Sequence, residues 1–323
     1  MFNIKFLNNP NAHCWMDPKL RFYPQGLVWL PWNRYWMITE VKHLGRYFEV
    51  VNNPQDADFI YALDPQAPDM ELVKKVDKPI VWRVFAGYSR SPIEEVRGKV
   101  VAGLYNTETT KSDFLRTYPH ELPPLELAYH PLNEEIFHSP KCPEPIFRQY
   151  VFVGSLTTRK RVDWAVDASI RAKVPLLIYH PSDIEPQVYN EVYQKATQYQ
   201  GLIMPSYNAQ PYLVYFMMSC SLALVCTSSW ESFYIPSIEV AYLGRPMIAV
   251  QLPVHDELWG DTYIKVKDKE ELADELAKDA TDLGKLSEYG RKMNERLNKD
   301  LWNKGVGNFG ELVSRIITEY LVR

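Results

Sequence analysis

The hydrophobic positions of the chain form short runs that alternate with segments in which apolar residues recur at helical spacing. A short apolar run bounded by polar or turn residues is typical of a buried strand. In the first half, the predicted strands are FNIKFL at the start, FEVV near 48, DFIYAL near 58, PIVWRVFA near 79 and KVVAGLY near 99. Helices are predicted at about 31–44, 69–75 and 107–117. This alternation predicts a mostly parallel sheet covered by helices.

The second half of the chain repeats the alternation after an interruption. Residues 118–147 show weak periodicity and many prolines, which indicates a linker, or a strand with flanking loops, at a domain boundary. The later predicted strands are YVFVG, LLIYH, GLIMP, LALVCT and PMIAV, and they alternate with predicted helices up to a charged helical tail. We therefore predict an α/β protein made of two doubly wound domains, residues 1–145 and residues 146–305.

The final segment of the chain carries a continuous apolar stripe. Its apolar residues recur at the i, i+3, i+4 and i+7 positions of a helix. The stripe consists of Phe309, Leu312, Val313, Ile316, Ile317, Tyr320 and Leu321. We expect one face of this helix to pack against another part of the protein.

Three consecutive cations, Arg159, Lys160 and Arg161, lie between a predicted strand and a predicted helix. Thr157 or Thr158 is a suitable N-cap, so the cations are expected in the first helical turn. The helix dipole is already positive there, and a cation at that end costs about 0.3–1 kcal/mol. An anionic ligand at this turn would remove the cost, whereas an ordinary exposed helix face is the simpler alternative.

Two glutamates lie in the segment TSSWESFYIPSIEVAYLGRP, residues 227–246. Pro236 suits a first helical position, so Glu231 is expected in the loop after a strand and Glu239 one turn into the helix. The backbone amides of 233–235 would form an anion-binding helix N-terminus. In doubly wound sheets, ligands bind at the carboxyl ends of the strands, where the three cations are also expected. Together these features suit a pyrophosphate whose neighbouring hydroxyls are held by carboxylates.

The simpler alternatives for the two glutamates are structural. Ser228 and Glu231 have the spacing of a capping box, although Pro236 would interrupt such a helix after about one turn. Glu239 could be an ordinary solvated glutamate of a helix.

Charge, cysteine content and the lack of long apolar runs bear on the possible ligands and cellular location of the protein. The 36 Lys and Arg against 40 Asp and Glu leave a net charge of −4, which argues against a dedicated nucleic-acid binder. The first ten residues do not resemble a signal peptide, and no apolar run has membrane-spanning length. The four cysteines form no CxxC motif and no disulfide-type spacing, which favours free thiols in a reducing compartment. We therefore expect a cytoplasmic protein.

No pattern in the sequence favours a metal site. Asp56 and Asp58 form an Asp-x-Asp pair, but it precedes a predicted strand far from the cation cluster. His130, His138 and Cys142 match no strong zinc spacing and lie in the proline-rich segment.

The second half of the chain resembles the retaining, nucleotide-sugar-dependent glycosyltransferases of the GT-B fold, specifically family four. ESFYIPSIEVAYLGRPMIAV has the family's Glu-x7-Glu spacing and is similar to its E-G-F-G-L-P-x-x-E-A-x-x-x-G-x-P-V-I-A pattern. VGSLTTRKRVD resembles the strand, glycine and Arg-Lys element that binds the donor pyrophosphate, and AYHPLNEEIF at 128–137 resembles the segment before the second domain. The resemblance covers most of 125–300. In the first domain it is limited to the strand pattern and AGLYNTETTKSDFL at 102–115.

This resemblance implies a fold and an activity. The fold would be GT-B, with two Rossmann-like domains facing a cleft and a C-terminal helix at about 306–323 crossing back to the first domain. The second domain would bind a UDP-, GDP- or similar nucleotide sugar, and the first domain the acceptor. The enzyme would move the sugar, a hexose by expectation, to a hydroxyl of a glycan, lipid-linked or other acceptor with retention, and would need neither a metal nor another cofactor.

The resemblance also implies roles for individual residues. Arg159 and Lys160 would neutralise the diphosphate, Glu231 would contact the hydroxyls of the donor sugar, and Glu239 would bind the ribose. Gly154 would let the backbone approach the phosphates. The other donor-binding residues would be Ser155, Ser232, Phe233, Tyr234 and Ile235. On the acceptor side we expect Asn9, His13, Trp32, Arg34 and Gly87.

Several alternatives stay open at this point. Tyr234 occupies a position at which the family usually has glycine, so a catalytically degenerate binding protein is one alternative. A sugar-nucleotide isomerase or epimerase of the same fold is another, because it would bind the same pyrophosphate. Trp29, Trp32 and Trp36 share one predicted helical face, which suits core packing, an acceptor-stacking platform or a peripheral membrane contact. The sequence does not indicate an oligomeric state.

Overall fold

The computed structural model describes residues 20–27, 35–63, 67–84, 92–118, 123–181 and 184–322. The chain divides into two compact units, which are described separately. The first unit contains residues 1–131 together with 301–323, and the second contains residues 132–300.

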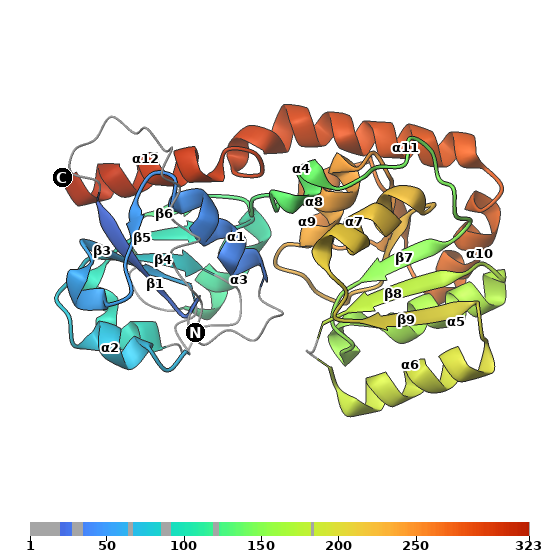
Figure 1. Cartoon of the computed structure of the whole chain (residues 1–323), viewed down its shortest axis with the longest axis horizontal. Coiled ribbons are helices and arrows are strands. Elements are labelled where there is room, and N and C mark those ends of the chain that lie inside the picture. Colours follow the sequence, from blue (N-terminus) through green and yellow to red (C-terminus); the bar gives the residue numbers. More distant parts are fainter. Residues whose placement is uncertain are drawn as a thin grey trace. The chain divides into compact units, whose positions relative to one another are not determined.

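The first unit is built on a parallel sheet with six strands among the described residues, in the order β2-β1-β3-β4-β5-β6. The strands are β1 (Arg21–Gln25), β2 (Glu49–Val50), β3 (Phe59–Ala62), β4 (Ile80–Val84), β5 (Val100–Tyr105) and β6 (Leu125–Leu127). The α-helices between them are α1 (Tyr35–Leu44), α2 (Met70–Lys74) and α3 (Glu108–Thr117). Figure 1 shows this alternation of strand and helix along the blue and cyan part of the chain.

The predicted pattern of the first unit is confirmed for three strands and differs at the start. FEVV forms only the two-residue strand β2, whereas RFYPQ, which was not predicted, forms β1. The prediction failed because Pro24 lies inside β1, and proline is unusual within a strand because it lacks a ladder donor. FNIKFL and residues 31–34 of the predicted first helix lie outside the described residues.

The C-terminal helix α12 (Phe309–Val322) belongs to the first unit. Phe309, Val313 and Ile317 are fully buried and pack in one cluster with Met37 and Val41 of α1. The predicted apolar stripe is therefore confirmed as a packing face.

The second unit contains a parallel six-stranded sheet, counted over its described residues, in the order β12-β11-β10-β7-β8-β9. Its strands are β7 (Tyr150–Val153), β8 (Leu176–His180), β9 (Ile203–Tyr207), β10 (Leu224–Cys226), β11 (Met247–Val250) and β12 (Ile264–Val266). Its α-helices are α4 (Glu135–His138), α5 (Val162–Ala172), α6 (Pro186–Gln198), α7 (Pro211–Cys220), α8 (Ile235–Tyr242), α9 (Pro253–Trp259), α10 (Lys269–Asp279) and α11 (Leu283–Arg296). The strand β12 lies in the segment that was predicted as a helical tail.

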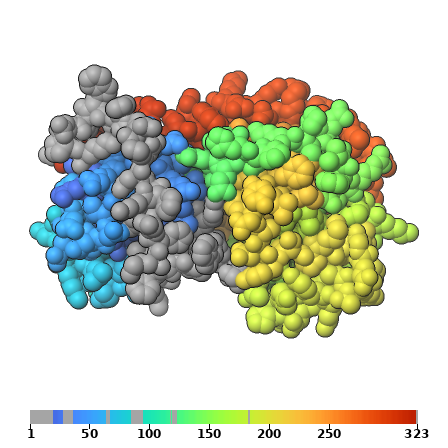
Figure 2. Space-filling view, viewed as in Figure 1, coloured from blue at the N-terminus to red at the C-terminus, as the bar shows by residue number. Residues whose placement is uncertain are grey.

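Figure 2 shows α6 and α7 at the surface of the second unit, where they form part of the yellow-green and yellow face. Two side chains of α7, Tyr212 and Leu213, are exposed, whereas Tyr215 and Met218 are buried. Over the part of the chain that the structure describes, no helix combines the length and the apolar composition needed to cross a membrane.

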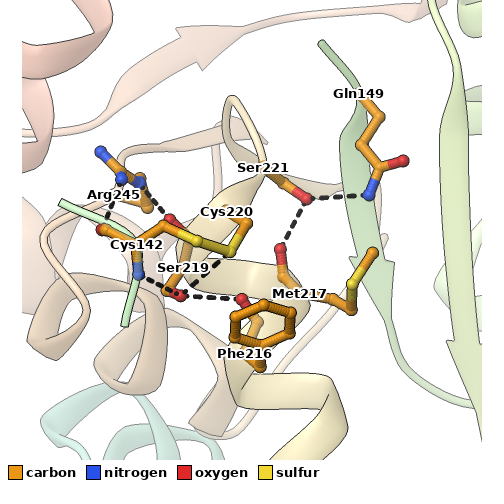
Figure 3. Close-up of a disulfide and its surroundings, with 8 residues drawn as sticks. All are labelled: Cys142, Gln149, Phe216, Met217, Ser219, Cys220, Ser221 and Arg245. Carbon is orange, nitrogen blue, oxygen red and sulfur yellow. Dashed lines mark hydrogen bonds between the residues drawn. A yellow bond between two sulfur atoms is a disulfide. The ribbon is translucent and has the colours of Figure 1, made fainter. Parts of the chain in front are cut away.

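A disulfide joins Cys142 to Cys220, with the two Cα atoms 5.1 Å apart (Figure 3). The backbone N–H of Cys142 donates to the hydroxyl of Ser219 at 3.1 Å. The guanidinium of Arg245 donates to the carbonyl oxygens of Cys142 and Ser219. The prediction that the cysteines are free thiols is therefore wrong for Cys142 and Cys220. The cysteine content consequently no longer supports the expected cytoplasmic location. Cys226 is free and buried.

Candidate active site

The candidate site of the second unit is formed by two loops that follow adjacent strands. One loop joins β7 to α5, and the other joins β10 to α8. The hydroxyl of Thr227 donates to the carbonyl oxygens of Lys160 at 2.9 Å and Arg161 at 2.8 Å. The N–H of Ser229 donates to the carbonyl oxygen of Arg159 at 2.9 Å. Because β7 and β10 flank the point where the strand order reverses, these loops lie where doubly wound sheets bind ligands.

The cation cluster has a different backbone conformation from the one predicted. Residues Thr158–Lys160 form a 3-10 turn, and α5 begins only at Val162. Arg161 is the N-cap of α5 and adopts a left-handed conformation with φ 46°, so neither predicted threonine caps the helix. Thus Arg159 and Lys160 precede the helix instead of occupying its first turn. The guanidinium of Arg161 lies 4.6 Å from the ring centroid of Trp164.

Glu231 brings the two remaining cations together. Lys160 Nζ lies 2.5 Å from Glu231 Oε1, and Arg159 Nη1 lies 3.2 Å from Oε2. The hydroxyl of Ser228 also donates to Oε1 at 2.6 Å. Burial alone would raise the pKa of this carboxyl, but the charges of Lys160 and Arg159 hold it below its ordinary value. Glu231 is therefore a buried, ionised carboxylate at the centre of the cluster, and not the capping-box residue of a helix, because α8 begins only at Ile235.

Arg159 is the outward part of the cluster. Its side chain is 42% exposed, and Nη1 also donates to the carbonyl oxygen of Trp230 at 2.8 Å. The guanidinium lies 5.8 Å from the centre of the Trp230 ring, which is itself partly exposed. Lys160, by contrast, is buried. Arg159 is therefore accessible to solvent, whereas Lys160 lies inside the loop.

Glu239 lies in α8, which begins at Ile235 with Pro236 as its second residue. The residue is only 7% exposed, and the hydroxyl of Tyr215 donates to its Oε1 at 3.0 Å. Burial raises the pKa of Glu239 to about 7, against the lowering effect of the hydrogen bond from Tyr215. The interpretation of Glu239 as a solvated helix residue is therefore wrong.

The remaining predicted donor residues lie in the same two loops. Gly154 and Ser155 follow β7 and are half-buried, and a Cβ at Gly154 would lie 3.5–3.6 Å from Phe152 and Lys160, which is ordinary contact. The protein itself therefore does not require glycine at this position. Ser232 and Ile235 are half-buried, and Phe233 is buried.

Tyr234 connects the two loops. Its hydroxyl donates to the carbonyl oxygen of Val153 at 3.0 Å, and its ring centroid lies 5.1 Å from Lys160 Nζ. Tyr234 thus supports the end of β7 and packs on the buried lysine.

The predicted acceptor residues Asn9, His13, Trp32, Arg34 and Gly87 lie outside the described residues. In the first unit, His130 is buried and its Nδ1 lies 2.7 Å from Glu40, which also pairs with Arg83 at 2.8 Å. Trp36 packs edge-on against His130, with ring centroids 5.1 Å apart. His130 and Cys142 are thus engaged in structural contacts. The described residues contain no group of three or more His, Cys, Asp or Glu side chains that could hold a metal ion.

Sequence reasoning missed the side chains that support the site. Thr227 and Ser229 hold the cation turn, and Tyr215 contacts Glu239 from α7. The serine- and threonine-rich start of the 227–246 segment was a usable signal for the first two. Tyr215 had none, because its contact depends on how α7 packs against α8.

Comparison with known proteins connects the chain to others through its fold. No protein-family model and no curated protein sequence matches it. The crystal structure of Anabaena HepE in complex with UDP-glucose has a TM-score of 0.74 at 13% identity, covering 93% of this chain and 100% of that chain. S. aureus TarM, in complex with fondaparinux, α-GlcNAc-glycerol and UDP, has a TM-score of 0.58 at 13% identity, covering 75% and 52%. The pneumococcal O-GlcNAc transferase GtfA, in complex with UDP and GlcNAc, has a TM-score of 0.60 at 12% identity, covering 81% and 57%.

The chain therefore spans just over half of TarM and GtfA and the whole of HepE. Identities this low establish the fold and no more. The two parallel-sheet α/β units with a C-terminal helix in the first unit agree with the architecture of these neighbours. The predicted fold class is confirmed: the chain has the GT-B fold.

Proposed function

We propose that the protein is a glycosyltransferase that moves a sugar from a nucleotide diphosphate sugar to a hydroxyl acceptor. The observation that carries the proposal is the arrangement around Glu231. One buried carboxylate holds Lys160 and Arg159 at the carboxyl ends of β7 and β10. A second carboxylate, Glu239, is buried eight residues later and has no cation beside it among the residues that the structure describes. Cations at this position suit a diphosphate, and a buried carboxylate with a hydroxyl donor suits a sugar diol.

Structural neighbours support the choice of a uridine diphosphate donor for the first experiments. HepE was crystallised with UDP-glucose, and TarM and GtfA were crystallised with UDP. A GDP-sugar or a similar donor is the next candidate, since no described contact identifies the base.

Each residue of the site has a proposed role in the transfer. Arg159 and Lys160 stabilise the negative charge that grows on the departing diphosphate, which is worth about 3–4 kcal/mol for one well-placed donor. Glu231 orients Lys160 and Arg159 and accepts hydrogen bonds from hydroxyls of the donor sugar. Glu239 binds the ribose hydroxyls. We further propose the retaining, metal-independent mechanism of family four, in which a donor phosphate oxygen takes the proton of the acceptor.

The experiment begins with purified protein and a panel of UDP-sugars and GDP-sugars. A bound donor raises the unfolding temperature in proportion to the logarithm of its concentration over its dissociation constant. The donor that shifts the transition is then incubated with simple glycoside, glycan and lipid acceptors, with and without EDTA. Release of the nucleoside diphosphate and an unchanged anomeric configuration in the product would support the proposal.

The same experiment separates the alternatives. A changed sugar formed from donor alone would indicate an isomerase or epimerase, and donor binding without turnover with any acceptor would indicate a binding protein. If none of the nucleotide sugars changes the unfolding temperature and no nucleotide is released with any acceptor, the proposal is refuted.

A further inference from the structure

Glu239 and Glu231 differ in the hydrogen bonds that their carboxylates receive. Glu231 receives hydrogen bonds from Lys160, Arg159 and Ser228. Among the described residues, only the hydroxyl of Tyr215 donates a hydrogen bond to the Glu239 carboxylate, at 3.0 Å. A buried carboxylate with one donor depends on that donor for its orientation.

The direction of each hydrogen bond at Tyr215 follows from the chemistry of its neighbours. The amide Nδ2 of Asn133 lies 3.0 Å from the Tyr215 hydroxyl and can only donate. The hydroxyl therefore accepts from Asn133 and directs its single hydrogen to Glu239. Asn133 is oriented in turn, because its Oδ1 accepts from the N–H of Glu135 at 3.1 Å.

The surrounding structure holds Tyr215 in place. It is 4% exposed and lies on α7, whose C-terminal end is bonded through Cys220 to Cys142. Arg245, just after α8, donates to the carbonyl of Ser219 at 2.6 Å, so α7 and α8 are also joined at their ends (Figure 3). Thus Tyr215 and Glu239 lie on two helices that are fixed by contacts outside the chain of hydrogen bonds, and Asn133 lies just before α4.

We propose that Tyr215, oriented by Asn133, is a positioning residue that holds the Glu239 carboxylate for the ribose hydroxyls of the nucleotide donor. This inference rests on the proposed function. With Oε1 held by Tyr215, the second oxygen and the remaining lone pair of Oε1 can accept from two neighbouring hydroxyls. Without the phenol hydroxyl, the carboxylate can rotate, and binding of the diol must first fix it again.

The test compares a nucleoside diphosphate with its 2′,3′-dideoxy analogue, which lacks the two hydroxyls. Whichever of UDP and GDP binds the wild-type protein is used with its analogue, and binding is measured by isothermal titration calorimetry. Tyr215→Phe is expected to weaken binding of the nucleoside diphosphate about 5- to 10-fold, as expected for one lost hydrogen bond. Binding of the dideoxy analogue is expected to stay unchanged. Tyr212→Phe on the same helix, where Tyr212 is 57% exposed, is the matched control and should change neither affinity.

A second variant removes the hydrogen bond that Asn133 donates to the Tyr215 hydroxyl. Asn133→Asp keeps an oxygen for the N–H of Glu135 but removes the amide donor, so the Tyr215 hydroxyl is drawn away from Glu239. The same selective loss is expected, even where Tyr215→Phe folds poorly.

The outcomes separate this inference from the function on which it rests. If the variants lose affinity for the nucleoside diphosphate but not for the dideoxy analogue, the positioning role of Tyr215 is supported. An equal loss for both ligands would mean a general structural role and would overturn it, as would no loss at all. A wild-type protein that does not distinguish the two ligands would remove the ribose role of Glu239 and the inference with it. Failure of the wild-type protein to bind UDP or GDP would instead refute the proposed donor class.

Discussion

Replacing Glu239 by glutamine perturbs one charge and leaves the shape of the side chain almost unchanged. The carboxyl has a pKa of about 7 in the folded protein against an ordinary value of 4.5, because it is buried and pairs with no cation in the described part of the chain. A pKa raised on folding means that the folded state holds the proton more tightly than the unfolded state between these two values. Stability contributed by the protonated form is therefore lost as pH rises from about 4.5 to 7, and the loss is complete somewhat above pH 7.

The magnitude follows from the two pKa values. One unit of pKa difference corresponds to about 1.4 kcal/mol, so ionisation of Glu239 should cost the folded state about 2–3 kcal/mol between pH 5 and pH 8. Glutamine at this position can still accept from Tyr215 but does not ionise. Glu239→Gln is thus expected to gain stability relative to the wild type as pH rises, by about the same 2–3 kcal/mol. Its affinity for the nucleotide donor should fall, because the ribose loses a charged acceptor.

Urea unfolding at half-unit steps from pH 5 to pH 8, followed by tryptophan fluorescence, measures this difference directly. Glu231→Gln is the matched control, since it makes the same substitution in the same segment. The pKa of Glu231 is lowered below its ordinary value by Lys160 and Arg159, so its stabilising contribution is present at neutral pH and is lost only as pH falls through that lowered pKa. Glu231→Gln should therefore destabilise the protein at pH 7, by about 3–5 kcal/mol, because Lys160 stays buried without its partner. A stability difference between wild type and Glu239→Gln that does not change with pH would refute the reasoning.

Two further predictions concern the cations and the disulfide. Lys160→Ala should lower kcat/KM for the transfer about 30- to 1000-fold, corresponding to about 2–4 kcal/mol, because Lys160 pairs with Glu231. Arg161→Ala should change kcat/KM little, because the Arg161 guanidinium lies over the ring of Trp164. Steady-state kinetics compare the two variants, and equal losses would contradict the assignment. Reducing the disulfide between Cys142 and Cys220, which closes a loop of 78 residues, should lower stability by about 2–4 kcal/mol; urea unfolding with and without dithiothreitol measures this, and an unchanged midpoint would count against it.

The alternation of apolar runs and helical spacing was enough to predict both sheets, because a strand buried on both faces is apolar along its whole length. The strands that escaped prediction lack that signature. Pro24 lies inside β1, and Lys265 lies between the two buried residues of β12. Their positions are set by pairing with neighbouring strands, which the sequence of one segment does not contain.

The candidate site was predictable to the level of its charged residues and no further. The spacing of Glu231 and Glu239 and the cluster at 159–161 identify two loops that follow predicted strands, and the fold brings these two loops together. The left-handed backbone of Arg161 could not be predicted, because non-glycine residues seldom adopt it. The pairing of Cys142 with Cys220 depends on the packing of α7 against a segment 78 residues away, so spacing alone could not indicate it.

The two glutamates have different surroundings, and this difference could not be predicted from the sequence. By spacing alone, Glu231 and Glu239 are two equivalent carboxylates on either side of a helix start. In the fold, Glu231 is neutralised by Lys160 and Arg159, whereas Glu239 is buried with one hydroxyl donor, that of Tyr215, within the described ranges. A carboxylate paired with cations can orient positive charge for a diphosphate, and a carboxylate that receives one hydroxyl donor keeps lone pairs that can accept from further hydroxyls. Under the proposed function, the same residue type would therefore serve both the diphosphate and the hydroxyls of a nucleotide sugar, and the difference between the two glutamates comes from the side chains that the fold places beside each one.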